Sequence, residues 1–430
     1  MSDQAPGDTV VAYAAETPHH HPAETLTSRQ QTQNAICYAL IVSISYLTAP
    51  VCYVGLMHAA LCDSAGASKM VANLPTSMAA FFGLAPLVAA WLFPYTRWIK
   101  PVMSYGYTLS AVGGLIVPIV LICSTPNWLR IAATILHAAL LLACNGTAGV
   151  FMWEAVIRGT TEGKRGKTFS ITFGVGPFFA VASSTGSQFV LDRVPYPYDF
   201  ALIFLTGSVL LLVNAVVARR FVIPLVGEVV EREAFGAFFV GGFRSFFASR
   251  TLVVLAAAYL LFYMALGAMN NALLNVKDVL GVQPQEMAGW CSALRFGAKG
   301  LAGVFLGLLL ARYGARSPAV ATGIVLAVAN LWTMVVPGYA YLIAFGLFGA
   351  GELGGLYYPH YVAAASRPDR LKRNICIYQI IGTLGTLSAA LLGFVADRYG
   401  MTASIGLALG AAALPILIFA VLPARPEPEN

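Results

Sequence analysis

Twelve long runs of apolar residues separated by polar stretches make up most of this sequence. Because about 20 apolar residues in a helix cross the hydrocarbon core of a bilayer, each run is long enough for one transmembrane helix. Six runs precede the longest hydrophilic interruption, residues 219–250, and six follow it. The pattern predicts an all-α integral membrane protein with twelve transmembrane helices in two six-helix bundles. The runs fall at 35–57, 74–94, 101–123, 129–153, 168–191, 198–218, 252–275, 287–310, 318–336, 340–363, 375–395 and 402–423.

The polar stretches divide the chain into five parts. Residues 1–33 are rich in Pro, Thr and Gln and lack the basic start of a signal peptide, so we expect a disordered cytoplasmic tail. The bundles are expected at 34–218 and 251–424, with a cytoplasmic linker at 219–250 and a second short tail at 425–430.

Composition and charge support this assignment. The chain has 430 residues, 58% of them hydrophobic and only 10% charged, a balance that excludes soluble and disordered proteins. Most of its 26 Lys and Arg residues fall in the tails and alternate loops that lie on one side. This asymmetry predicts that both termini are cytoplasmic in a multi-pass protein of the plasma (cell inner) membrane. The net charge of +7 is therefore a topology signal, and we expect no nucleic-acid partner.

The linker carries a stripe of aromatic residues at three- and four-residue spacing. Arginines at 232, 244 and 250 flank this stripe. A helix with such a face is typical of the membrane interface, so we expect contact with lipid; a partner-binding helix is the alternative. The stripe consists of Phe235, Phe238, Phe239, Phe243, Phe246 and Phe247.

The two halves resemble each other. Gly146 and Gly149 align with Gly351 and Gly354, and the segment 189–193 aligns with 394–398 at the same spacing. Matches that keep their order across both halves indicate an internal duplication.

Repeated six-span halves, cytoplasmic termini and a basic linker resemble the major facilitator superfamily of secondary transporters. The superfamily's loop pattern is partly present after span 8 as Gly307, Arg312, Gly314 and Arg316, with Ala311 in place of its acid. The resemblance implies substrate binding near the bilayer midplane with alternating access, and it makes Arg312 and Arg316 candidate gating residues. We expect a proton gradient to drive transport.

Three ionisable residues lie deep inside predicted spans. Arg295 and Lys299 are four residues apart on one face of span 8. Lys299 lies roughly 21 Å from the outer edge at 1.5 Å per residue, and Glu352 in span 10 lies roughly 18 Å deep. Buried charges are costly, so we expect Glu352 to pair with one cation and a cation to bind an anionic group of the substrate. An inert ion pair that fixes packing is the alternative.

Other polar groups could support coupling, gating or substrate binding. Glu352 and His360 share span 10 and are candidate proton carriers, while Glu154 could bridge to Arg158 or contact a gate. His137 in span 4 is expected to be hydrogen-bonded structure. The neutral candidates for substrate binding are Asn270, Asn271, Trp290, Tyr357, Tyr358, Tyr378 and Gln379, about half of which we expect to be structural.

These observations favour a secondary transporter of a small anionic organic solute, coupled to protons. No phosphate-binding loop, metal cluster or nucleophile motif is present, so we expect neither a pump nor an enzyme, no cofactor and no metal. We expect a monomer in the lipid bilayer. The competing interpretation is a non-transporting receptor or assembly factor for a membrane pigment or complex.

Overall fold

The computed structural model describes residues 22–422 apart from 124, 225–233, 315 and 367–370, and every regular element in that part of the chain is a helix. Ten helices or runs of helices there are long and apolar enough to cross a membrane. The two remaining predicted spans, 35–57 and 168–191, fold as a broken helix and as one long helix. All twelve predicted spans are therefore helical and in the predicted order.

The N-terminal half begins earlier than the sequence predicts. Part of the tail expected at 1–33 is helical, because Thr27 and Gln30 form a capping box that starts α1 at Ser28. Gln31 then donates to the carbonyl of Ala23 and holds the preceding turn. The elements of this half are η1 (Pro22–Thr25), α1 (Ser28–Leu47), α2 (Ala49–Cys52), α3 (Leu56–Ser64), α4 (Lys69–Ser77), α5 (Ala79–Phe82), α6 (Ala85–Leu92), η2 (Thr96–Trp98), α7 (Ile99–Ile122), α8 (Asn127–Gly159), α9 (Glu162–Arg193) and α10 (Tyr198–Ala218).

The linker contains the helix α11 (Phe235–Ala248), as its phenylalanine spacing predicts. The side chains of Phe235, Phe239, Phe243 and Phe247 follow one another with ring centroids 4.7–6.0 Å apart. The C-terminal half then comprises α12 (Arg250–Leu274), α13 (Val276–Leu280), α14 (Pro284–Tyr313), α15 (Arg316–Val335), η3 (Gly338–Leu342), α16 (Ile343–Glu352), α17 (Gly354–Ala365), α18 (Leu371–Gly385), α19 (Ser388–Tyr399) and α20 (Met401–Val421).

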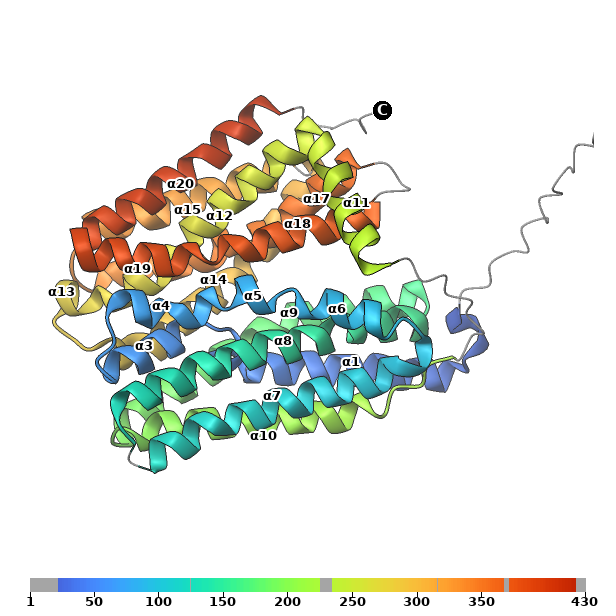
Figure 1. The fold of residues 1–430 in the computed structure, drawn as a ribbon, viewed down its shortest axis with the longest axis horizontal. Helices are drawn as coiled ribbons and strands as arrows, with labels where there is room; N and C mark the ends of the chain where they lie inside the picture. Colours follow the sequence, from blue (N-terminus) through green and yellow to red (C-terminus); the bar gives the residue numbers. More distant parts are fainter. Residues whose placement is uncertain (1–21, 124, 225–233, 315, 367–370, 423–430) are drawn as a thin grey trace, which may run out of the picture.

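Figure 1 shows the halves as two stacked bundles, the N-terminal one in blue to green and the C-terminal one in yellow to red. They meet where α14 packs along α9 and where α19 packs along α4. The helix α11 lies at one end of the bundles, which we call the linker end. The opposite end, formed by the turns at 65–68, 194–197 and 281–283, is the far end.

Four of the spans are interrupted rather than continuous. Span 1 breaks at Thr48 and again at 53–55, where Pro50 and Gly55 cannot continue a regular helix, and span 2 is divided around Met78 and Gly83. Span 10 divides at Leu353 and span 11 at 386–387. Breaks of this kind expose backbone polar groups, which is tolerated in a membrane only where protein or water satisfies them.

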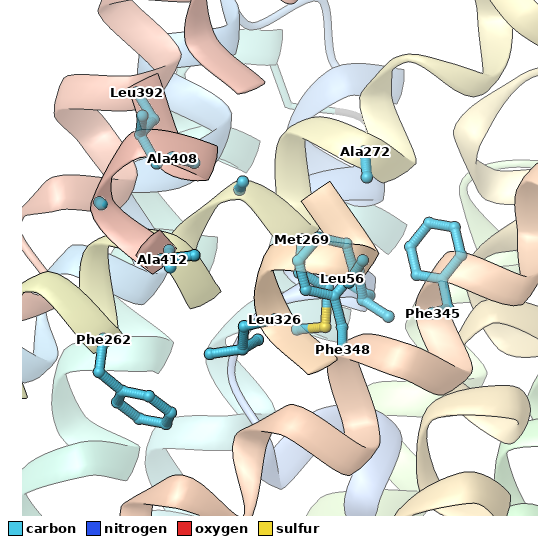
Figure 2. Close-up of a cluster of buried hydrophobic side chains, with 14 of the residues drawn as sticks. Leu56, Phe262, Met269, Ala272, Leu326, Phe345, Phe348, Leu392, Ala408 and Ala412 are labelled. Carbon is cyan, nitrogen blue, oxygen red and sulfur yellow. The ribbon is translucent and has the colours of Figure 1, made fainter. Parts of the chain in front are cut away.

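The apolar core joins the halves at the far end. One large cluster contains Leu56 of α3 together with Met269 of α12 and Phe348 of α16, and Figure 2 shows these three residues among its members. A separate cluster toward the linker end, which includes Tyr38 and Phe151, consists of residues from the N-terminal half. The halves therefore share a core at the far end and have separate cores at the linker end.

Polar contacts also close the far end. The carboxylate of Asp397 on α19 accepts the backbone N–H groups of Lys69 (3.0 Å) and Met70 (2.9 Å) at the start of α4. The second pair of helices that joins the halves, α9 and α14, has a similar contact. Gln188 on α9 accepts the N–H of Gly289 on α14 at 2.8 Å. We call these two contacts the far-end seal.

Two glycines allow the helices of the far-end seal to approach so closely. A Cβ atom at Gly393 would overlap the backbone of Lys69, and one at Gly289 would overlap Gln188. An ion pair of 2.8 Å between Lys277 and Asp63 reinforces this end.

Candidate functional site

The buried charges of the C-terminal half form one connected group. Arg295 on α14 donates to Glu352 at the end of α16 through Nε (2.8 Å to Oε2) and Nη2 (2.9 Å to Oε1). Lys299, one turn further along α14, lies 3.1 Å from the same Oε1. The side chains of Arg295, Lys299 and Glu352 are only 7%, 16% and 16% exposed. We call these three residues the charge triad.

Close helix packing brings the triad together. A Cβ atom at Gly349 would overlap the backbone of Arg295, so α16 and α14 touch through their main chains at this point. Small residues at a helix interface permit this approach in membranes. Glu352 follows one turn after Gly349, at the last residue of α16, and therefore reaches both cations.

The triad carries more positive than negative charge. Both oxygens of Glu352 are occupied, and in the part of the chain that the structure describes no second carboxylate pairs with Arg295 or Lys299. Two cations therefore share one anion. A surplus buried charge costs several kcal/mol unless a counter-ion or water offsets it, which makes this place attractive to an anion.

The N-terminal half presents aromatic rings to the triad. Lys299 Nζ lies 5.4 Å and Arg295 Cζ 5.9 Å from the ring centroid of Tyr53, both within range of a cation–π contact. Tyr53 occupies the break in span 1, stacks on Tyr46 at 6.3 Å and meets the ring of Phe296 edge-on at 5.0 Å. The triad therefore lies between the two halves of the molecule.

Four neutral residues that the sequence suggested for substrate binding have packing or hydrogen-bond partners other than the triad. Tyr358 and Tyr378 are fully buried and pack on Tyr259 with centroids 5.9 and 4.4 Å apart, inside the C-terminal half. Asn270 and Asn271 donate to Thr76 and Ser404, which makes them part of the packing at the interface of α12. Packing and hydrogen bonding between helices are therefore sufficient to explain why these residues occur inside the spans.

The remaining neutral candidates have three different environments. The hydroxyl of Tyr357 donates to Gly303 at 3.5 Å on the linker side of α14. Gln379 is exposed although it lies within span 11. Trp290 is 41% exposed and lies near the start of α14, toward the far end of the molecule. His360 belongs to α17, but its side chain lies outside the described part of the chain.

The candidate gating residues make local contacts. Glu154 pairs with Arg158 at 2.9 Å, as their spacing on α8 predicts. Arg316 donates to the carbonyl of Ala420 and so ties the start of α15 to the end of α20. Arg312 is exposed beside the ring of Tyr313, 5.4 Å from its centroid.

Sequence patterns did not identify the partners of two important groups. His137 is hydrogen-bonded, as expected, but its partner is His58 of α3, with 3.2 Å between His58 Nε2 and His137 Nδ1. Tyr46 and Tyr53 were also missed, because their contact with the triad depends on the break in span 1. The one signal for this break was the placement of Pro50 and Gly55 inside an apolar run.

Comparison with known proteins agrees with this architecture. Residues 255–430 match the family model of the Major Facilitator Superfamily. A stretch of 179 residues is 30% identical to the Xenopus laevis protein called solute carrier family 2, facilitated glucose transporter member 12. This stretch covers 41% of the chain and 30% of that relative, so the chain spans under a third of the relative's length.

Solved structures share the fold over almost the whole chain. The nucleoside transporter NupG is 11% identical with a TM-score of 0.65, covering 91% of this chain and 97% of that one. A bacterial homologue of the lysosomal transporter Spinster, in an inward-facing and occupied conformation, is 13% identical with a TM-score of 0.64, covering 94% and 100%. The transporter FucP, in an outward conformation, is 15% identical with a TM-score of 0.60, covering 90% and 99%.

Proposed function

We propose that this chain is a member of the major facilitator superfamily and a secondary transporter of a small anionic organic solute. The family-model match of residues 255–430 and the shared fold support this proposal. The observation that carries the proposal is the charge triad, in which Arg295 and Lys299 share the single carboxylate of Glu352 at the junction of the halves. A solute anion there would offset the surplus charge. Rocking of the halves would then expose it to either side.

The proposed orientation places the linker end in the cytoplasm of a cell with this protein in its plasma membrane. The basic residues of the loops and linker support this orientation, because Lys and Arg concentrate on the cytoplasmic side. With the far-end seal closed on the outside, the molecule would be in an inward-facing state. Both termini would then be cytoplasmic.

We further propose that protons drive the transport and that Glu352 carries the proton. Its carboxylate touches both cations, so a proton on Glu352 would compete with them and change the charge of the site. His360, eight residues further along span 10, is the second candidate. A Glu352→Gln variant is expected to exchange solute across the membrane but to lose uphill transport, and unchanged uphill transport would refute this coupling role.

Uptake into proteoliposomes tests transport itself. A panel of labelled organic anions would be offered with and without a pH gradient to the wild type, Arg295→Ala and Lys299→Ala. Arg97→Ala, which removes an exposed cation far from the triad in sequence, is the matched control. The proposal expects uptake by the wild type and the control and loss in the two triad variants.

The same experiment separates a transporter from a receptor or assembly factor of the same fold. A receptor would bind an anion in a thermal-shift assay but would not move it across the liposome membrane. Normal uptake by Arg295→Ala and Lys299→Ala would instead reject the triad as the solute site.

A further inference from the structure

We infer that the solute is a monovalent carboxylate with a flat apolar body, and this inference rests on the proposed function. It rests on two features of the same place: the size of the charge surplus in the triad, and the chemistry of the residues that face the triad from the other half.

The charge count sets the valence of the solute. Arg295 and Lys299 bring two positive charges and Glu352 brings one negative charge, and all three side chains are at most 16% exposed. One negative charge makes the occupied site neutral, whereas a dicarboxylate or a doubly ionised phosphate would leave a buried negative charge. Since an unpaired buried charge is costly whichever its sign, a monoanion fits best.

The aromatic residues that face the triad indicate the shape of the rest of the solute. Tyr46 and Tyr53 are both partly exposed, and they form one apolar cluster with Phe296, Ala49 and Ala180. The ring centroids of Tyr53 and Phe296 lie within 5.9 Å of both cations, so this aromatic surface borders the charge triad directly. Rings beside an anion site favour a ligand whose carboxylate meets the cations while its flat face meets an aromatic surface.

Three simple anions separate these two features. Benzoate has one carboxylate on a ring, phthalate has two carboxylates on the same ring, and acetate has one carboxylate without a ring. Binding to the purified full-length protein would be measured by calorimetric titration at a pH where all carboxylates are ionised. We expect benzoate to bind at least about tenfold more tightly than phthalate, and acetate more weakly than benzoate.

Variants then change the charge count in a known direction. Glu352→Gln leaves two unpaired cations, so the preference should reverse and phthalate should bind more tightly than benzoate. Lys299→Gln leaves the two-bond contact between Arg295 and Glu352 intact and the site neutral, so both anions should be lost while the protein stays folded. This second variant keeps the test valid if Glu352→Gln fails to fold, and Arg97→Gln is the control that should bind like the wild type.

The same titrations test the role of the aromatic ring of Tyr53. Tyr53→Leu should reduce the affinity for benzoate to near that for acetate, and Tyr53→Phe should retain the difference, because the ring and not the hydroxyl carries it. Equal affinity for benzoate and acetate in the wild type would overturn the aromatic part of the inference.

The outcomes distinguish the inference from the function on which it rests. If the wild type binds none of the three anions and transports no organic anion, the proposed function fails. If it binds phthalate as tightly as benzoate, or if Lys299→Gln still binds benzoate, anion transport can stand but the monocarboxylate inference is wrong.

Discussion

Glu352 is the residue on which the candidate site depends, because its two oxygens receive three contacts from two cations. Arg295 makes two of these contacts and Lys299 makes one. Glu352 itself has no substitute in the described part of the chain, so its removal leaves both cations without a carboxylate.

Glu352→Gln is therefore expected to destabilise the folded protein. Removal of one partner from a buried ion pair typically costs about 3–5 kcal/mol, because the remaining charge is desolvated without compensation. Thermal unfolding in detergent would show a lower melting temperature, and millimolar benzoate should restore more stability to the variant than to the wild type. A melting temperature equal to that of the wild type would show that water solvates the two cations well enough without Glu352.

Arg295→Lys is expected to weaken anion binding although the formal charge is unchanged. Arginine makes two parallel hydrogen bonds to Glu352, and a lysine ammonium cannot reproduce this planar geometry. The loss of one charge-assisted hydrogen bond to Glu352 corresponds to about 1.5–3 kcal/mol. The freed carboxylate oxygen would then attract Lys299 more strongly and leave less positive charge for the solute anion. Titration with benzoate measures the effect; Arg97→Lys serves as the reference, and an unchanged affinity would show that only the charge matters.

The sequence was sufficient to predict the triad but not the residues around it. Depth along a helix follows from 1.5 Å per residue, so equal depths of Lys299 and Glu352 in two spans predicted their contact. The positions of Tyr53 and His58 depend on a break in span 1 and on how it packs, which no periodic pattern encodes. Tyr358 and Tyr378 are fully buried, and a sequence pattern does not distinguish a buried aromatic residue from one that lines a pocket.

At the scale of helices, the sequence predicted the spans well and their interruptions poorly. Hydrophobic length identifies a spanning segment, but it is insensitive to a few residues of irregular backbone within it. The interruptions at Leu353 and at 386–387 carry no proline. Gly354 and Gly355 follow the first and Gly385 precedes the second, but glycines are also common in uninterrupted membrane helices and do not by themselves mark a break. The two interruptions fall in spans 10 and 11, the first of which carries Glu352.

The close approach of α19 to α4 gives a test at this scale. Gly393→Ala should weaken the contact between α19 and α4 that holds the far end closed, because the added methyl group would overlap the backbone of Lys69. Gly410→Ala on α20 is the matched control, since a Cβ atom there meets nothing within 4 Å.

Cys62 reports the state of the far end. It is fully buried in a small cluster that contains Ala72 of α4 and Ala396 of α19. In a protein whose other cysteines are replaced, a thiol reagent should modify Cys62 faster in Gly393→Ala than in Gly410→Ala. Equal rates in the two variants would mean that this helix contact does not control opening.

At the scale of the molecule, the halves share a core at one end and are separate at the other. This arrangement predicts the side of the membrane from which water and solutes reach the centre of the protein. Gln379 is exposed within span 11, whereas Cys62 is buried near the far end.

A Gln379→Cys variant without other cysteines should therefore react with a membrane-impermeant maleimide added to the cytoplasmic side, and not when it is added outside. Comparison of inside-out vesicles with intact cells measures this difference, and Cys62 as the single cysteine should be protected from both sides. Reaction of Gln379→Cys from the outside alone would reverse the proposed orientation.

The far-end seal has a consequence for how this sequence can vary. Asp397 and Gln188 bind main-chain N–H groups of the opposite half, so the side chains at 69, 70 and 289 take no part in these bonds. Position 289 must stay small, whereas at 69 and 70 the bonds require only a backbone N–H group, which every residue except proline supplies. One inserted residue near the start of α4 would instead rotate the following N–H groups by about 100° around the helix and misalign them with the carboxylate. The seal should thus tolerate point mutations at 69 and 70 to any residue except proline and reject changes of length.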